Sequence, residues 1–219
     1  MSEQDLRAAL VAASRTMETA GLNTGTAGNI SARLGDDMLI TPSGVPNDAL
    51  SPDGLAVMKL EPGDEPIWKG PFKPSSEWRF HRDVLRARGD VGAIVHAHAP
   101  YATALAIARK PIPPCHYMIA AFGGADIRCG DYALFGTQAL SDIATQALVD
   151  RNGCLLANHG MIAIGRDLPH ALWLAVELEN LARQYWLSLQ IGGPVLLTET
   201  EIAEAREKFA HYGLNAQKA

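Results

Sequence analysis

The feature that most constrains this chain is a short apolar run that ends in two histidines, Val91-Gly92-Ala93-Ile94-Val95-His96-Ala97-His98. The run predicts a β-strand, and successive side chains of a strand point to opposite faces of the sheet. His96 and His98 therefore share one face and can reach one cation together. Two imidazoles without partners on a buried face would be costly, and a shared metal ion removes that cost. The spacing therefore predicts a metal site at the end of a strand.

Two further residues extend this predicted site. His159 follows a second apolar run at 153–158, and Glu77 follows two serines. Three neutral imidazoles and a carboxylate suit an open catalytic zinc site, and manganese or cobalt fits the same ligands. Taken alone, Glu77 also fits an ordinary first-turn helix glutamate. The four remaining histidines are expected to be ordinary core or surface residues: His81, His116, His170 and His211.

The predicted elements mix hairpins with helices. Helices are expected at 4–20, 76–88, 100–109, 136–150, 168–190 and 199–209. Strands are expected at 29–33, 38–41, 55–60, 91–98, 153–158 and 161–164. The segments 61–74 and 111–132 are expected to be irregular, and Ser75 or Ser76 to cap the helix that follows. Because a regular βαβ alternation is missing, the order predicts an α/β fold with a largely antiparallel sheet covered by helices. The length predicts one domain, 1–219.

Composition narrows the classes of function. The 219 residues carry a net charge of −5 and contain no run of lysine or arginine, which argues against a nucleic-acid partner. No apolar run approaches the ~20 residues of a membrane span, and the N-terminus lacks the pattern of a signal peptide. The odd, widely spaced cysteines Cys115, Cys129 and Cys154 indicate a reducing, cytoplasmic setting.

Three loops combine small hydroxyl residues with glycine or the start of a helix, at 24–29, 41–44 and 75–77. Backbone N–H groups in such turns form anion-binding concavities. Any one of them also fits an ordinary turn, but three beside a metal site favour a phosphorylated small molecule. No P-loop and no GxGxxG after a strand is present, so the sequence does not indicate nucleotide binding. From chemistry alone, Tyr117 and Tyr212 are ordinary packing residues.

Seven segments together resemble a known family. They lie at 25–31, 39–44, 75–81, 95–98, 116–120, 158–160 and 208–214. In this order, and over nearly the whole chain, they closely resemble the class II aldolases of the L-fuculose-1-phosphate aldolase type. The resemblance implies an α/β/α sandwich around a mainly antiparallel sheet, assembled as a cyclic homotetramer with sites between subunits.

The resemblance also implies roles for individual residues. His96, His98 and His159 would hold zinc, with Glu77 as a fourth ligand and as the proton-transfer group once substrate displaces it. Seven residues would surround the substrate phosphate: Thr26, Gly28, Asn29, Ser43, Gly44, Ser75 and Ser76. Tyr117 and Tyr212 would come from a neighbouring subunit, and Tyr117 would donate a proton to the aldehyde oxygen.

The expected activity is reversible retro-aldol cleavage of a ketose 1-phosphate to dihydroxyacetone phosphate and an aldehyde. L-Fuculose 1-phosphate and the 5-deoxy- and 5-methylthioribulose 1-phosphates are the candidate substrates. Three other activities of the same fold remain open: a sugar-phosphate 4-epimerase, a methylthioribulose-1-phosphate dehydratase and a sugar-acid phosphate decarboxylase. A non-catalytic adducin-like scaffold is disfavoured because His96, His98 and His159 are all present.

Overall fold

A mixed β-sheet forms the middle layer of the computed structural model, which describes residues 2–210. Eight strands in the described residues form the sheet in the order β4-β3-β2-β1-β5-β8-β7-β6. Their bounds are β1 Asn29–Leu34, β2 Asp37–Ile40, β3 Ala56–Lys59, β4 Trp68–Lys69, β5 Ala93–Ala97, β6 Arg128–Gly130, β7 Gly153–Leu156 and β8 Gly160–Gly165. Neighbouring strands are antiparallel except for β6 and β7, which run parallel. The prediction of a mainly antiparallel sheet is confirmed, with that one parallel pair at its edge.

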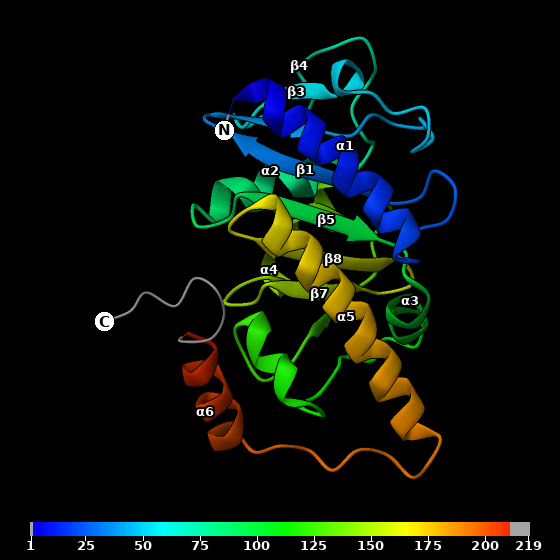
Figure 1. Cartoon of the computed structure of the whole chain (residues 1–219), viewed down its shortest axis with the longest axis vertical. Coiled ribbons are helices and arrows are strands. Elements are labelled where there is room, and N and C mark those ends of the chain that lie inside the picture. The colour runs from blue at the N-terminus through cyan, green and yellow to red at the C-terminus, as the bar shows by residue number, and fades with distance from the viewer. Residues whose placement is uncertain (1, 211–219) are drawn as a thin grey trace.

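Helices cover both faces of the sheet. In Figure 1, α1 (Glu3–Thr19) and α5 (Leu168–Leu189) cross the near face, while α2 (Trp78–Ala87) and α4 (Gln138–Ala147) lie behind the strands. The short helix α3 (Pro100–Ile107) packs beside α5, and α6 (Glu199–Ala210) contacts the 3-10 helix η2 (Tyr117–Phe122). A second 3-10 turn, η1, spans Pro52–Gly54. These layers confirm the predicted α/β/α sandwich.

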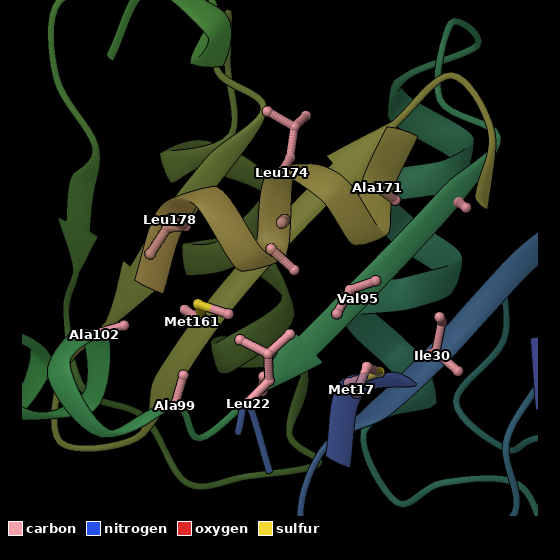
Figure 2. Close-up of a cluster of buried hydrophobic side chains, with 14 of the residues drawn as sticks. Met17, Leu22, Ile30, Val95, Ala99, Ala102, Met161, Ala171, Leu174 and Leu178 are labelled. Atoms are coloured by element: carbon pink, nitrogen blue, oxygen red, sulfur yellow. The ribbon is translucent and has the colours of Figure 1, made fainter. Parts of the chain in front are cut away.

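The alternation along β5 divides its side chains between the two faces. Val95 belongs to the same apolar cluster as Leu174 and Leu178 of α5, and Figure 2 shows members of this cluster between β5 and α5. Ile94 belongs to the other apolar layer, beneath α2 and α4, and His96 points to that same side because it lies two residues on. The period of two therefore directs the first metal-ligand candidate toward α2.

Several local predictions were wrong. The segment 61–74 contains the two-residue strand β4, which exists because β3 offers it a paired edge. The segment 111–132 contains η2 and β6, and β6 depends on pairing with β7. Neither serine caps α2: its N-cap is Glu77, and the Ser75 hydroxyl instead accepts a hydrogen bond from the Glu77 N–H at 3.3 Å.

A search for bilayer-crossing helices among residues 2–210 found none of sufficient length and apolarity. The single domain predicted for 1–219 stays a prediction.

Candidate active site

Three imidazoles meet where β5 ends and β8 begins. His96 lies in β5, His98 follows it, and His159 lies in the turn between β7 and β8. Because His96 is paired with Ile162 of β8, the turn that carries His159 comes beside the end of β5. The ligand atoms of the three histidines all lie within 4.8 Å of one another. The structure thus brings together residues that are far apart in the chain.

Local backbone features position His159. Asn158 has a φ of 55°, in the left-handed region that asparagine tolerates better than most residues. Its N–H donates to the carbonyl of Ala106 at 3.0 Å, and its side-chain oxygen accepts from Arg109 at 3.2 Å. At Gly160, a Cβ would lie only 2.5 Å from the Ala97 carbonyl oxygen and 2.9 Å from the His98 ring. A glycine after His159 is therefore required for the two strand ends to approach this closely.

A hydrogen bond fixes the tautomer of His96. Its Nδ1 lies 2.9 Å from the carbonyl oxygen of Met161, which can only accept, so Nδ1 carries the proton. In the neutral form of His96 the lone pair is therefore on Nε2, which points into the cluster. The Nε2 atoms of His96 and His98 are 3.1 Å apart. Tetrahedral zinc with bonds of about 2.0–2.1 Å separates its nitrogen ligands by roughly 3.3 Å, so the spacing fits a metal ion.

Glu77 completes the cluster from the start of α2. One carboxylate oxygen lies 3.2 Å from His96 Nε2, and the other lies 3.1 Å from His159 Nε2. Burial opposes ionisation of Glu77, but the charge of His96 and the hydrogen bond from His159 outweigh burial and hold its pKa below the usual range. A buried, ionised carboxylate facing three imidazoles is a donor set suited to a divalent cation.

Burial favours the neutral, ligating form of His98. Burial, and then the neighbouring His96 and His159, lower the pKa of His98 to about 4. At His96 burial acts in the same direction, but the Glu77 carboxylate outweighs it and raises the pKa. A cation at the cluster would replace the proton that Glu77 favours on His96, because imidazole binds metals in its neutral form.

A cavity of about 330 Å³ opens beside this cluster. Glu77, His98 and His159 line one part of it. All seven residues expected around a phosphate also line it: Thr26, Gly28, Asn29, Ser43, Gly44, Ser75 and Ser76. Among the described lining residues there is no lysine or arginine, so an anion here would depend on backbone N–H groups, hydroxyls and the start of α2.

Backbone contacts hold these loops together. The Ser43 N–H donates to the carbonyl of Lys73, and the Ser75 N–H donates to the carbonyl of Thr41. At Gly28, whose φ is 75°, a Cβ would meet the side chain of Asn23 at 2.3 Å. The same asparagine accepts a hydrogen bond from the His98 N–H at 3.2 Å. Asn23 therefore links the 24–29 loop to the histidine strand, a connection that the sequence analysis missed.

A buried hydrogen-bonded chain behind Glu77 was also not predicted from the sequence. Asn29 donates from its side-chain nitrogen to Glu77 Oε2 at 2.9 Å, and its side-chain oxygen lies 2.5 Å from His81 Nε2. His81 Nδ1 in turn lies 2.7 Å from the Ser31 hydroxyl. The expectation that His81 is an ordinary residue overlooked its i, i+4 spacing from Glu77, which was the one signal available.

A second missed element is the loop after β6. Tyr132, Ala133 and Phe135 line the cavity, and the Gly136 carbonyl accepts a hydrogen bond from Arg79 at 2.9 Å. The tyrosine and phenylalanine side chains are largely exposed. This loop adds an aromatic wall to a cavity that is otherwise lined by small and polar residues.

The two expected tyrosines are not brought to the cavity within the described residues. Tyr117 begins η2, is 53% exposed, and stacks on Phe209 of α6 with ring centroids 6.1 Å apart. It does not line the cavity of its own chain. Tyr212 lies outside the described residues.

Comparisons with known proteins give matches over most of the chain. The family model described as "Class II Aldolase and Adducin N-terminal domain" matches residues 8–186. A 5-methylthioribulose-1-phosphate/5-deoxyribulose-1-phosphate aldolase of Rhodospirillum rubrum is 54% identical over 212 residues, covering 97% of this chain and 94% of the relative. An L-fuculose phosphate aldolase of Escherichia coli is 46% identical over 203 residues, covering 92% of this chain and 93% of the relative. A solved structure of an L-fuculose 1-phosphate aldolase superposes with a TM-score of 0.90 at 36% identity, covering 95% of this chain and 98% of that one.

Proposed function

Because this chain belongs to the class II aldolase and adducin family, we propose that it is a metal-dependent aldolase that reversibly cleaves a ketose 1-phosphate to dihydroxyacetone phosphate and an aldehyde. One observation carries the proposal. The cluster of His96, His98, His159 and Glu77 borders the same cavity as the three loops expected to surround a phosphate. That juxtaposition supports the proposal, because a phosphorylated substrate with a reacting carbonyl requires a cation site beside an anion site.

His96, His98 and His159 are the residues that would hold the metal, with Glu77 as a further ligand. A divalent ion there would supply Lewis-acid stabilisation of the negative charge that develops when a carbon–carbon bond breaks. We propose zinc, because neutral imidazoles and a carboxylate are its usual catalytic ligands, with manganese or cobalt as substitutes.

Glu77 is the group that we assign to proton transfer at carbon C3. In the direction of condensation the ionised carboxylate removes a proton from C3, and in cleavage the carboxylic acid form returns that proton to C3 after the C3–C4 bond has broken. We propose that a base takes the proton of the C4 hydroxyl with Tyr117 of a neighbouring subunit as the relay. The position of Tyr117 outside the cavity of its own chain is compatible with such an origin. We propose that Tyr212 joins the same shared site.

The seven cavity-lining loop residues would bind the phosphate through N–H and hydroxyl groups. For the aldehyde portion we favour 5-deoxyribulose 1-phosphate or 5-methylthioribulose 1-phosphate over L-fuculose 1-phosphate. The Rhodospirillum rubrum relative is named for the first two substrates. The aromatic rings of Tyr132 and Phe135 also suit a terminal methyl or methylthio group.

A product assay tests the function. We expect metal-loaded protein to release dihydroxyacetone phosphate from at least one of the three ketose 1-phosphates. A chelator should abolish the release and zinc should restore it, and borohydride should trap no substrate adduct. Release of carbon dioxide from a sugar-acid phosphate, epimerisation of a pentulose 5-phosphate or loss of water from methylthioribulose 1-phosphate, without dihydroxyacetone phosphate, would each replace the proposal.

Subunit mixing tests the proposed homotetramer. If Glu77 and Tyr117 act at one site from different subunits, Glu77→Gln and Tyr117→Phe are each inactive alone. Refolding them together should regenerate about a quarter of the wild-type sites. No recovery, or light scattering at the mass of a monomer, would contradict a shared site. We also propose a cytoplasmic location, in keeping with three free thiols, to be checked by cell fractionation.

A further inference from the structure

We infer that His81 is a positioning residue, which orients the Glu77 carboxylate for proton transfer through a buried hydrogen-bonded chain that runs Ser31–His81–Asn29–Glu77. The inference deepens the proposed function and rests on it, because it assumes that Glu77 moves a proton at the substrate carbon. It gives a specific task to a histidine that neither contacts the cavity nor belongs to the metal cluster.

The hydrogen-bonding partners allow one consistent set of proton positions. The ionised Glu77 carboxylate only accepts, so the NH₂ group of Asn29 must face it. The oxygen of Asn29 then faces His81, and His81 Nε2 must donate to it. His81 Nδ1 is consequently unprotonated and accepts from the Ser31 hydroxyl. Each link therefore fixes the direction of the next, from the acceptor-only carboxylate of Glu77 at one end to the hydroxyl of Ser31 at the other.

Burial makes this hydrogen-bonded chain of four side chains rigid. Ser31 and His81 are fully buried, and Asn29 and Glu77 are each 7% exposed. The His81 ring stacks on Phe80 with centroids 4.5 Å apart. Burial also lowers the pKa of His81 to about 3, in keeping with a neutral ring. Hydrogen bonds are stronger in such a low-dielectric setting, and an unpaired group there is costly, so the chain resists rearrangement.

The hydrogen-bonded chain leads from the protein interior to the cavity. Asn29 and Glu77 line the cavity, whereas His81 and Ser31 lie behind them, between α2 and the sheet. The face on which His81 lies is otherwise packed with apolar side chains such as Phe80 and Ile94. A leucine could fill such a place. A polar ring that instead completes a network ending at the carboxylate is better explained by the geometry it imposes on Glu77.

Three variants and one control separate positioning from packing. His81→Leu removes both hydrogen bonds of the ring, His81→Gln keeps an amide donor near the place of Nε2, and Ser31→Ala removes only the far end of the chain. Val84→Ala, a buried apolar position on the same helix, is the matched control for loosened packing. Each metal-loaded variant is tested for exchange of the C3 hydrogen of dihydroxyacetone phosphate with deuterated water, followed by NMR.

This exchange isolates the proposed step of Glu77, because the carboxylate takes the C3 proton and returns a deuteron without any aldehyde. We expect His81→Leu to slow exchange by about 10- to 100-fold, as a misplaced group does, while KM changes by less than about threefold. His81→Gln should recover most of the rate. Ser31→Ala should lose about threefold, and Val84→Ala should stay near wild type. Cobalt affinity and the visible absorption of bound cobalt should be unchanged in all four.

Several results would overturn the inference. One is a rate of C3 exchange in His81→Leu that equals the rate in Val84→Ala. Another is a rate in His81→Gln that is as low as in His81→Leu. A third is a loss of cobalt affinity that parallels the loss of rate. If His81→Leu fails to fold, Ser31→Ala decides: a loss of rate at constant KM supports the inference, and no loss refutes it. The proposed function itself would be refuted if the wild-type protein neither exchanged the C3 hydrogen nor cleaved any ketose 1-phosphate. Normal exchange in every variant would instead refute only the role of His81.

Discussion

The two faces of the sheet differ in what their strands carry. Toward α1, α3 and α5, the inward side chains are apolar, and Val95, Met161 and Leu178 are typical of them (Figure 2). Toward α2, the same central strands carry Ser31, His96 and other polar groups among apolar neighbours. In Figure 1 these are the near and far sides of one sheet. Adjacent residues of one strand thus serve a purely apolar layer and a polar site.

The difference separates stability from chemistry. The apolar face depends mainly on shape complementarity, so hydrophobic burial is large there, with polar exceptions such as Ser14, whose hydroxyl donates to Asn47. On the α2 face each buried polar group needs a partner, and here the partners are one another and, in the proposed function, a metal ion. We therefore expect changes on the first face to affect folding, and changes on the second to affect catalysis more than folding.

The largest expected effect is on the α2 face. Glu77→Gln should lower the rate of dihydroxyacetone phosphate formation by about 10²–10⁴, because the proton carrier is lost. The free energy of unfolding should change little, since the amide still accepts from Asn29. Glu179→Gln is the matched control: this carboxylate lies on α5 and accepts the N–H groups of Tyr101 and Ala102. A variant at Glu77 that keeps more than about a tenth of the activity would contradict its assigned role.

Leu178→Ala tests the opposite face. Leu178 lies on α5 and is fully buried, and removing most of its side chain leaves a cavity, so we expect a loss of about 2–5 kcal/mol in the free energy of unfolding. The kcat of the remaining folded protein should match wild type. Denaturant titration and a kinetic assay measure the two quantities. A large fall in kcat with little loss of stability would break the proposed division between the faces.

Gly160→Ala tests the start of β8, directly after His159. The added methyl group would press on the Ala97 carbonyl and the His98 ring, so we expect a cost of about 1–3 kcal/mol in stability and weaker metal binding. Gly89→Ala serves as control, because a Cβ added there would meet no atom within 4 Å and the φ of Gly89 is not in the left-handed region. Titration with zinc reports the affinity. Equal affinity in both variants would show that the turn tolerates a side chain.

The smallest effect concerns a contact between α2 and α4, outside the cavity. Burial tends to raise the pKa of Asp83, but hydrogen bonds from Arg82, Gln138 and Ser141 outweigh it and lower the pKa. Because the pKa of Asp83 is lower in the folded than in the unfolded protein, where it is about 4, its ionised carboxylate stabilises the fold at pH values above about 4. This contribution is lost as the pH falls through the pKa of the folded state. Asp83→Asn should therefore cost under about 1 kcal/mol at about pH 7 and progressively less below about pH 4, with kcat unchanged. A cost independent of pH would indicate that the charge of Asp83 contributes nothing.

Local patterns were enough to predict much of this molecule. The period of two placed His96 and His98 on one face, and the small, hydroxyl-rich loops predicted three of the segments that line the cavity. These inferences succeed because strand alternation and turn chemistry depend on near neighbours. The strands β4 and β6 were missed because each exists only through a paired edge. The cap of α2 was misassigned because Glu77 is held by contacts from distant strands.

The sequence by itself determined the layered fold and the identity of the metal-ligand candidates, because apolar periodicity and residue chemistry are written along the chain. Only the tertiary structure decided which of those groups meet. It brought His159 within reach of His96, linked Ser31 and His81 to Glu77, and left Tyr117 away from the cavity of its own chain. Such contacts depend on strand register and helix packing, which are properties of the whole fold and not of any one segment.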